Sequence, residues 1–272
     1  MLTKFDAIKG GNELNWKDRI KDLRSTQSGS WGIMIEDPQS GETYEDNAQG
    51  LFSAASVIKV PIMMEIYRQD REKSLSLDDI LTLKAEEVVG GCGVLQVLHL
   101  GINLTIRDVV ALMITVSDNT ATNMMIEKAG IDSINTLMRS IGMERSILRR
   151  KLMMPELARQ GIRNEITAWD IVLSLKSLDN TDFLDKDACN DMIGLLKMQQ
   201  LNHKIPLMLP NDAVVAHKTG EDTGITHNAG IIYANKKRFY MCVLSEGVTD
   251  IPSGHRFIAE IARICYDAIL AE

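Results

Sequence analysis

The sequence lacks any long apolar run. Its longest apolar stretch, around Val109 to Val116, is far shorter than the roughly 20 residues that a helix needs to cross a bilayer. The N-terminal residues 1–10 also lack the apolar segment of a secretion signal. We therefore expect no membrane span, and a cytoplasmic protein as the sequence is written. If a signal segment had been removed, the protein would be periplasmic or secreted.

Clustered positive charge is also missing. The chain has 30 Lys and Arg against 37 Asp and Glu, which gives a formal net charge of -7. Proteins that bind nucleic acid through its phosphates need clusters of Lys and Arg to displace counterions. The charge balance therefore argues against nucleic acid as a partner.

Cysteine and histidine are few and lack the spacing of metal sites. The cysteines are Cys92, Cys189, Cys242 and Cys265. The histidines are His99, His203, His217, His227 and His255. Without Cys-x-x-Cys, His-x-His or His-Glu-x-x-His, the sequence supports neither a zinc site nor a thioredoxin-type motif. We expect no metal and no cofactor, and four mostly buried, reduced thiols.

The hydrophobic content allows a sizeable core. Of 272 residues, 45% are hydrophobic, which is enough for one large domain or two modest lobes. We expect a monomer. Trp16, Ile20 and Leu23 suit one face of a helix, residues 31–36 are typical of a strand, and residues 37–41 of a turn.

From about residue 56 to residue 200 the pattern becomes helical. Thr105 and Asp108 have the spacing of a capping box ahead of an apolar set at helical intervals. Two further helical stretches end at Gly130 and Gly142, where glycine can take the left-handed C-cap conformation. This section is predicted to be mainly α.

Strand signals return near the C-terminus. They cover residues 213–217, 227–233 and 238–245, and the last two are joined through residues 235–237 as a hairpin. A final helix is expected over about 254–270. We predict an α+β fold with an antiparallel sheet flanked by helices. One domain comprises 1–55 plus 205–272, an all-α domain of 56–204 is inserted in it, and an active-site cleft lies between them.

The pair Ser56 and Lys59 has the spacing of a nucleophile and its activator. If Ser56 begins a helix, Lys59 lies one turn further along the same face. Its amine must be partly neutral to take a proton, which requires desolvation or a neighbouring cation such as Lys218. Pro61 supports a helix start near Ser56, because proline is tolerated in the first turns. Taken alone, the pair is better explained as an ordinary helix surface.

A second motif, Ser117-Asp118-Asn119, lies between two helical segments. Capping alone explains such residues. In the functional interpretation, Ser117 relays a proton to the leaving group, and Asn119 orients Lys59 and the substrate. This requires a short loop that faces the cleft.

The third motif, Lys218-Thr219-Gly220, follows an apolar strand. In the functional interpretation Lys218 and Thr219 bind an anionic group of the substrate, and Gly220 lets a substrate backbone approach closely. The backbone N–H of Glu221 would join that of Ser56 as an oxyanion hole. The alternative is an exposed strand end with a solvated lysine.

Taken together, the three motifs resemble the class A β-lactamases and the related penicillin-binding proteins. Ser117 follows Ser56 by 61 residues and Lys218 follows Ser117 by 101, a layout that is closer to the class A enzymes. The segments 52–62 and 117–123 resemble that family beyond the motifs. The resemblance covers nearly the whole chain from about residue 15. It implies a β-lactamase/D,D-peptidase-like fold, an acylated Ser56 activated by Lys59, and a carboxylate clamp of Lys218 and Thr219.

One element of the family pattern is absent. Class A enzymes carry Glu-Pro-Glu-Leu-Asn in an Ω-shaped loop, and its first Glu activates the water that hydrolyses the acyl-enzyme. The matching segment here has Met154 in place of that Glu and Ala158 in place of the Asn. Asn164 stands where an Asp normally closes the loop by a salt bridge. Glu156 and Glu165 are the remaining candidates for deacylation, because a shorter loop can shift the register.

These features predict a serine hydrolase that forms an acyl-enzyme on Ser56 with β-lactams and releases it slowly. One alternative is a D,D-carboxypeptidase or esterase that acts on a D-Ala-D-Ala-like or ester substrate. Another is a covalent penicillin-binding sensor with negligible turnover. A non-catalytic relative is disfavoured, because all the motif side chains occur together.

Overall fold

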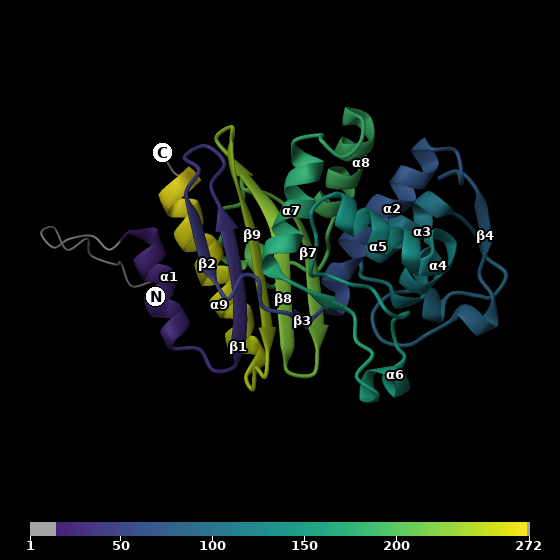
Figure 1. Cartoon of the computed structure of the whole chain (residues 1–272), viewed down its shortest axis with the longest axis horizontal. Coiled ribbons are helices and arrows are strands. Elements are labelled where there is room, and N and C mark those ends of the chain that lie inside the picture. Colours follow the sequence, from purple (N-terminus) through teal and green to yellow (C-terminus); the bar gives the residue numbers. More distant parts are fainter. Residues whose placement is uncertain (1–14, 271–272) are drawn as a thin grey trace, which may run out of the picture.

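The computed structural model describes residues 15–270, and its centre is a five-stranded antiparallel sheet (Figure 1). The strands lie in the order β2-β1-β9-β8-β7. They comprise β1 Ser30–Glu36, β2 Thr43–Asp46, β7 Val214–Asp222, β8 Ile225–Ala234 and β9 Lys237–Glu246. The sheet therefore joins strands from both ends of the chain, and the predicted antiparallel arrangement is confirmed.

Tight turns set the register of the sheet. Ala234 pairs with Lys237 across a two-residue turn in which Asn235 and Lys236 both have positive φ, 50° and 64°. Such a turn matches the right-handed twist of the two strands that it connects. At the β1–β2 turn, a carboxylate oxygen of Asp37 accepts a hydrogen bond of 2.9 Å from the backbone N–H of Gln39. Both hairpins lie where the sequence predicts them.

Two helices cover one face of the sheet, α1 (Trp16–Ser25) and α9 (Ile251–Cys265) (Figure 1). They bury a core in which the rings of Trp31 and Phe257 meet edge to face at 4.6 Å. The helix α9 begins at Ile251, earlier than the predicted Gly254, because the side chain of Asp250 caps its first turn. Residues 266–270 continue it as a π-helical turn.

The other face of the sheet carries the helical part of the molecule. Its helices are α2 Lys59–Arg71, α3 Ile106–Thr115, α4 Asn119–Ala129, α5 Ile131–Ser140, α6 Pro155–Arg159, α7 Ala168–Asp179 and α8 Lys186–Lys197. Short strands form two small pairs, β3 Phe52–Ser53 with β6 Glu165–Ile166 and β4 Ile80–Thr82 with β5 Asn103–Thr105. The 3₁₀ turns are η1 Ala55–Ile58, η2 Ala85–Glu87, η3 Leu95–Val97 and η4 Ile205–Met208. The section predicted to be mainly α is confirmed.

The helix ends follow local chemistry. Thr105 caps α3 by accepting a hydrogen bond of 3.0 Å from the N–H of Asp108, whose carboxylate returns one of 3.0 Å to the Thr105 N–H. This is the predicted capping box. Gly130 and Gly142 follow α4 and α5 with φ of 82° and 86°, a region in which most side chains are strained. Local sequence therefore determines where these helices stop.

The helical part and the sheet share a core. Ala229 and Leu244 of the sheet belong to the same buried cluster as Leu175 of α7 and Met113 of α3. Alternate residues of each strand face this core and the core under α9, as strand geometry requires. The predicted α+β class, with helices flanking an antiparallel sheet, is confirmed. The division into 1–55 plus 205–272 and an inserted 56–204 stays a prediction. Helix α7, which belongs to the inserted segment, packs directly on β1 and β9 of the sheet.

The cysteines are distributed unevenly between core and surface. Cys189, Cys242 and Cys265 are buried and unpaired, as expected, whereas Cys92 is exposed. The prediction of a buried thiol is wrong for Cys92, because it lies in a glycine-rich loop outside the apolar core.

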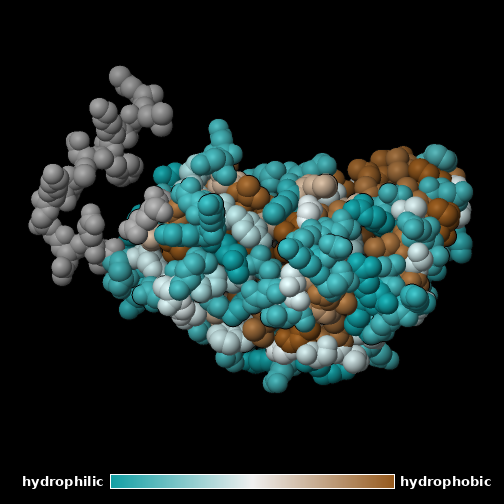
Figure 2. All heavy atoms as spheres, turned by 90° about the horizontal axis from the view of Figure 1, so that it is seen from above, coloured by the Kyte–Doolittle hydropathy of each residue, from teal (hydrophilic) through white to brown (hydrophobic). Residues whose placement is uncertain are grey.

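Exposed apolar side chains gather at the end of the molecule that carries β4, as Figure 2 shows. The exposed large hydrophobic residues include Ile80, Val97 and Leu100. Within residues 15–270, no helix has the length and apolar character needed to cross a bilayer.

Candidate active site

A cavity of about 330 Å³ opens beside the free edge of β7. It is where the three sequence motifs come together. Its lining consists of Ser53, Ala55, Ser56, Gly91, Cys92, Ser117, Asn119, Arg150, Leu152, Met153, Asn164, Leu201, Thr219, Gly220, Glu221 and Asp222. The chain folds these distant segments onto one surface because η1, the α3–α4 loop and β7 all pack at the edge of the shared core.

Ser56 lies on a tight turn rather than in the first turn of an α-helix. The 3₁₀ turn η1 contains it, and α2 follows from Lys59. Ala55 directly before it has φ of 42°, a conformation that costs a non-glycine residue of order 1 kcal/mol. Pro61 falls in the first turn of α2, where its missing N–H removes no helical hydrogen bond. The nucleophile candidate is thus held at a helix start, as predicted, by a strained turn that the sequence did not indicate.

Lys59 is fully buried and points its amine at the α3–α4 loop. Its Nζ donates hydrogen bonds to the backbone oxygen and the Oγ of Ser117, at 2.8 and 3.1 Å, and to Oδ1 of Asn119 at 3.0 Å. Burial lowers the pKa of Lys59 to about 7. The first cause is thus desolvation, not the charge of Lys218. An appreciable fraction of this amine is neutral near pH 7.

Ser117 occupies a left-handed backbone conformation, with φ of 56°, in the short loop between α3 and α4. The next residue, Asp118, caps α4 through the N–H of Ala121 at 2.9 Å, and also accepts hydrogen bonds from the N–H groups of Val94 and Leu95. The capping interpretation is confirmed for Asp118, and the functional interpretation of Ser117 and Asn119 stays a prediction that is compatible with it. Asp118 fixes the loop, and the loop presents Ser117 to the cavity.

Lys218 completes a chain of polar groups around the Ser117 hydroxyl. Its Nζ donates to Ser117 Oγ at 2.9 Å and to the Thr219 carbonyl at 2.9 Å. Complete burial and the nearby charge of Lys59 hold the pKa of Lys218 well below its ordinary value. It is not a solvated lysine. The buried amines of Lys59 and Lys218 thus both hydrogen-bond the hydroxyl of Ser117.

The strand β7 is longer than the sequence predicts and contains the whole third motif. It extends to Asp222, because pairing with β8 continues through Glu221 opposite Thr226. Both the N–H and the carbonyl of Thr226 are bonded to the side chain of Ser245 on β9. Opposed residues of an antiparallel pair bond either to each other or away from each other, so the N–H of Glu221 faces the free edge. This edge borders the cavity.

Gly220 allows close packing against the Ser56 turn. A Cβ at Gly220 would lie 3.2 Å from Ser56 N and 3.2 Å from the Cβ of Ala55. The protein's own Ser56 turn thus approaches Gly220 closely, and the expected approach of a substrate backbone to this residue, which also lines the cavity, stays a prediction. The close packing brings the N–H groups of Ser56 and Glu221 to the same part of the cavity.

Comparison with known proteins agrees with this arrangement. The model of the beta-lactamase enzyme family matches residues 15–269. This chain belongs to that family. A beta-lactamase of Bacteroides uniformis is 24% identical over 270 residues, which cover 93% of this chain and 90% of that protein.

Solved structures of the β-lactamase fold also match over almost the whole length. The beta-lactamase of Sphaerobacter thermophilus superimposes with a TM-score of 0.86 and 31% identity, covering 94% of this chain and 97% of that one. A mutant of PBP-A, solved as an acyl-enzyme complex with penicillin G, gives a TM-score of 0.84 and 25% identity, covering 93% and 95%. The β-lactamase/D,D-peptidase-like fold expected from the motifs is confirmed.

In this β-lactamase-family chain, neither Glu156 nor Glu165 lines the cavity. Glu156 lies on α6, exposed, and pairs with Arg159 at 2.9 Å. Glu165 lies in β6 and pairs with Arg149. Of this loop, Leu152 and Met153 line the cavity and Met154 does not. Met153 takes a left-handed conformation with φ of 58°.

The loop that carries Met153 is closed by an amide. The Oδ1 of the buried Asn164 accepts from the N–H groups of Arg149 and Arg150 at 2.8 and 3.0 Å. Its Nδ2 donates to the carbonyl of Arg150 at 2.9 Å. A neutral side chain thus closes the loop in this β-lactamase-family chain without the salt bridge of the class A pattern.

Several residues of the cavity lining escaped the sequence analysis. Arg150 brings a positive charge to the cavity, and Cys92 a thiol. Leu152 and Leu201 add apolar surface. The only sequence signal for any of them was the glycine-rich segment 90–93, whose Gly91 and Gly93 have φ of 90° and 112°. The others lie in loops whose course depends on tertiary packing.

Proposed function

We propose that this member of the beta-lactamase family is a serine hydrolase that acylates Ser56 with β-lactams and releases the acyl group slowly. One observation carries the proposal. The amines of Lys59 and Lys218 both hydrogen-bond the hydroxyl of Ser117 in the wall of a cavity that Ser56 also lines. A hydroxyl held between two amines with lowered pKa values can accept and deliver a proton near neutral pH.

The acylation step follows from these positions. The hydroxyl of Ser56 attacks the lactam carbonyl and gives its proton to neutral Lys59, one turn along the chain. The N–H groups of Ser56 and Glu221 receive the developing oxyanion. The proton then passes through Ser117 to the lactam nitrogen as the C–N bond breaks. Among these groups, Lys59 and Lys218 both hydrogen-bond Ser117, and Ser56 lines the same cavity as Ser117.

The anionic group of the substrate would meet two different kinds of partner. Thr219 lines the cavity, so its hydroxyl can bind a carboxylate directly. Lys218 is fully buried, and its amine donates to the Thr219 carbonyl and so holds that residue in place. Arg150 is a further cation in the lining. We therefore assign the carboxylate contact to Thr219, with Lys218 in support.

Slow release is supported by what surrounds the acyl site. The acidic residues in the lining are Glu221 and Asp222, both on β7, the strand that carries the oxyanion N–H. The loop opposite presents the thioether of Met153, which cannot deprotonate a water. Within residues 15–270, no carboxylate lines that side of the cavity to activate a hydrolytic water.

Intact-mass spectrometry after addition of penicillin tests this function. We expect a rapid gain of one penicillin mass, followed by a slow return to the original mass as the penicilloyl group is hydrolysed. A mass that never changes at stoichiometric or excess penicillin would rule the function out. An adduct that never decays would instead identify a covalent penicillin-binding sensor.

A D,D-carboxypeptidase or esterase is the second candidate, favoured by the likeness to PBP-A and by the missing loop carboxylate. Such an enzyme would use the same acylation groups on a D-Ala-D-Ala-like peptide or an ester. Release of D-alanine or of an ester alcohol, at a rate above that of the Ser56→Ala variant, would identify it. Absence of release with both substrates would leave the β-lactam activity.

Acylation should depend on pH through Lys59. The pKa of this lysine lies at about 7, below its ordinary value of 10.5, so the neutral form dominates above pH 7 and the charged form below it. We expect the acylation rate to fall about tenfold per pH unit once the pH drops below 7. Rates of penicillin adduct formation from about pH 5 to pH 9 measure this. A rate that rises as the pH falls would contradict the role of Lys59.

A carboxylate placed at Met153 should speed the release of the acyl group. Met153→Glu would put a general base in the cavity wall, and we expect deacylation to accelerate by about 10²-fold. Met154→Glu is the matched control, because Met154 is not part of the lining. The decay of the penicillin adduct by mass spectrometry gives both rates. Acceleration by Met154→Glu alone would show that the register of this loop is that of the sequence motif.

A further inference from the structure

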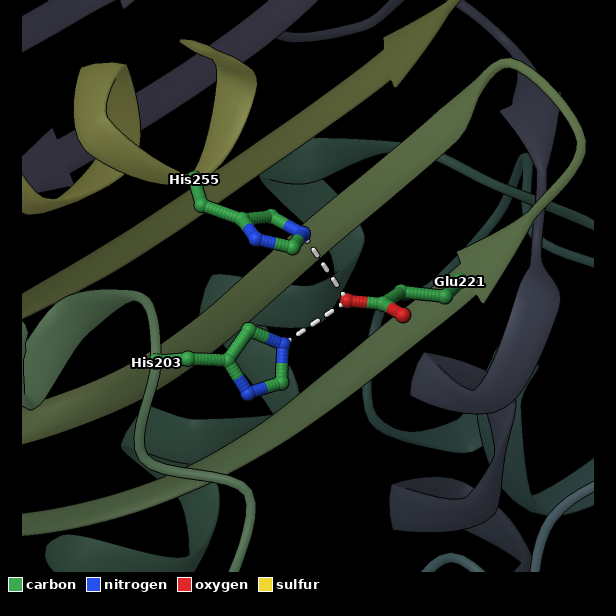
Figure 3. A group of neighbouring side chains, drawn as sticks. All are labelled: His203, Glu221 and His255. Carbon is green, nitrogen blue, oxygen red and sulfur yellow. Dashed lines mark hydrogen bonds and ion pairs between the residues drawn. The ribbon is translucent and has the colours of Figure 1, made fainter. Parts of the chain in front are cut away.

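A cluster of two histidines and one carboxylate lies next to the cavity but is not part of its lining, apart from Glu221 itself (Figure 3). His203 comes from the loop after α8, Glu221 from β7 and His255 from α9. The Oε1 of Glu221 lies 2.8 Å from Nε2 of His203 and 3.0 Å from Nε2 of His255. Three elements that are distant in sequence thus aim their donor atoms at one point.

We propose that His203, Glu221 and His255 form a binding site for a divalent transition metal of the zinc class. Two imidazole nitrogens and one carboxylate oxygen are a ligand set that zinc takes, with a fourth position left to water. The residues show no spacing in the sequence that would reveal it. The sequence analysis therefore expected no metal.

The distances suit such an ion. With bonds of about 2.0–2.1 Å, two ligands of a tetrahedral zinc lie about 3.3 Å apart. All three donor atoms lie within 4.8 Å of one another. The two Oε1–Nε2 distances, 2.8 and 3.0 Å, are a few tenths of an ångström shorter than this spacing, so the carboxylate must move slightly away from both rings to admit the ion. The side chains are partly exposed, so an ion can enter from solvent.

A second observation points to a ligand at this place. Nε2 of His255 is buried and makes no hydrogen bond, although it lies beside the carboxylate. Its contact of 3.0 Å with Oε1 lacks the geometry of a hydrogen bond, and coordination to an ion would give this buried nitrogen a well-directed bond. The rings of His203 and His255 are tilted by 57° to each other with centroids 4.6 Å apart, and both Nε2 atoms point toward Oε1 (Figure 3).

The framework around the cluster is already rigid. Lys204, next to His203, donates to the carbonyls of Gly220 and His227 at 3.1 and 3.0 Å. Ile205 N–H donates to Oδ1 of Asn228 at 3.1 Å. These bonds pin the His203 loop to β7 and β8. Lys204 also lies 2.9 Å from Oε1, but its two carbonyl partners remain when the carboxylate turns toward a metal.

The site has a consequence for catalysis, which rests on the proposed function. The backbone N–H of Glu221 is the proposed oxyanion donor, and its side chain would hold the metal. A bound ion would anchor the end of β7 to α9 and the His203 loop. We expect zinc to change the rate of acylation while leaving its dependence on Ser56 intact.

Titration calorimetry with zinc chloride on the full chain tests the site directly. We expect one ion per chain, and a loss of affinity of more than about tenfold in both His203→Ala and His255→Ala, because even changes behind a metal ligand cost that much. His99→Ala, at an exposed position outside the cluster, is the matched control and should bind as the unaltered protein does. Thermal melting should show a zinc-dependent rise that both cluster variants lack.

Two further measurements keep the result interpretable. Cobalt(II) bound in place of zinc should give no thiolate charge-transfer band, which separates this site from the exposed Cys92. His255→Asn serves if His255→Ala does not fold. Equal zinc affinity in the unaltered protein and both histidine variants, or no binding at all, would overturn the proposal. Because binding is measured without penicillin, a failure of acylation would leave this test unaffected.

Discussion

Replacement of Ser56 by alanine should abolish the penicillin adduct completely. Ser56 lines the same cavity as Ser117, and it directly follows the strained Ala55 in the turn that leads into α2. Removing the nucleophile of a serine hydrolase lowers turnover by on the order of 10⁶-fold. Intact-mass spectrometry should show the unmodified mass at every time after penicillin is added.

Ser140→Ala is the matched control for this experiment. Ser140 ends α5 outside the cavity, and its hydroxyl bonds only a backbone carbonyl, that of Leu137. The control should form the adduct at the rate of the unaltered protein. An adduct that still forms on Ser56→Ala, located on another residue by peptide mapping, would contradict the assignment of the nucleophile.

Replacement of Lys59 by methionine should lower the acylation rate by on the order of 10³-fold. Methionine is similar in length and apolar, so it fits the buried channel of the lysine stem but supplies no amine. General bases contribute roughly 10²–10⁴-fold to such reactions. Stopped-flow or quenched-flow mass measurements of adduct formation give the rate.

A change in pH dependence separates a chemical role of Lys59 from a structural one. If Lys59 takes the proton of Ser56, the decline of acylation below pH 7 should disappear in Lys59→Met along with most of the rate. Lys176→Met is the matched control, because Lys176 pairs with Glu36 away from the cavity. An unchanged acylation rate in Lys59→Met, in a variant that melts cooperatively, would exclude the general-base role.

Much of the fold could be predicted because local chemistry determines it. The capping box of Thr105 and Asp108 marks the start of α3 in the sequence as in the structure. The hairpin through Asn235 and Lys236 follows from turn residues between two apolar strands. Element ends were less accurate: β7 continues five residues past the predicted end at His217, because pairing with β8 extends it.

The sequence predicted which residues gather at the site, but not the burial, pKa shifts and backbone conformations of these residues. The burial that lowers the pKa of Lys59 comes from α2, α3 and α4 packing together, which no local pattern reveals. Leu152 and Met153 line the cavity and Met154 does not, in a loop where Met153 is left-handed. The close contact of Gly220 with the Ser56 turn is likewise a product of tertiary packing.

The sequence by itself determined the family and the antiparallel α+β architecture, and it pointed to Ser56, Lys59, Ser117 and Lys218 as the proposed acylation groups. Motifs, periodicity and capping depend on residues that are close together in the sequence, so they can be recognised from the sequence alone. Only the tertiary structure decided the contacts between distant segments. In the folded chain the amines of Lys59 and Lys218 both hydrogen-bond the hydroxyl of Ser117, and the N–H of Glu221 faces the free edge of β7. Folding also brings His203, Glu221 and His255 together from three elements. Burial and convergence depend on packing across the whole chain, which is why they appear only once the chain is folded.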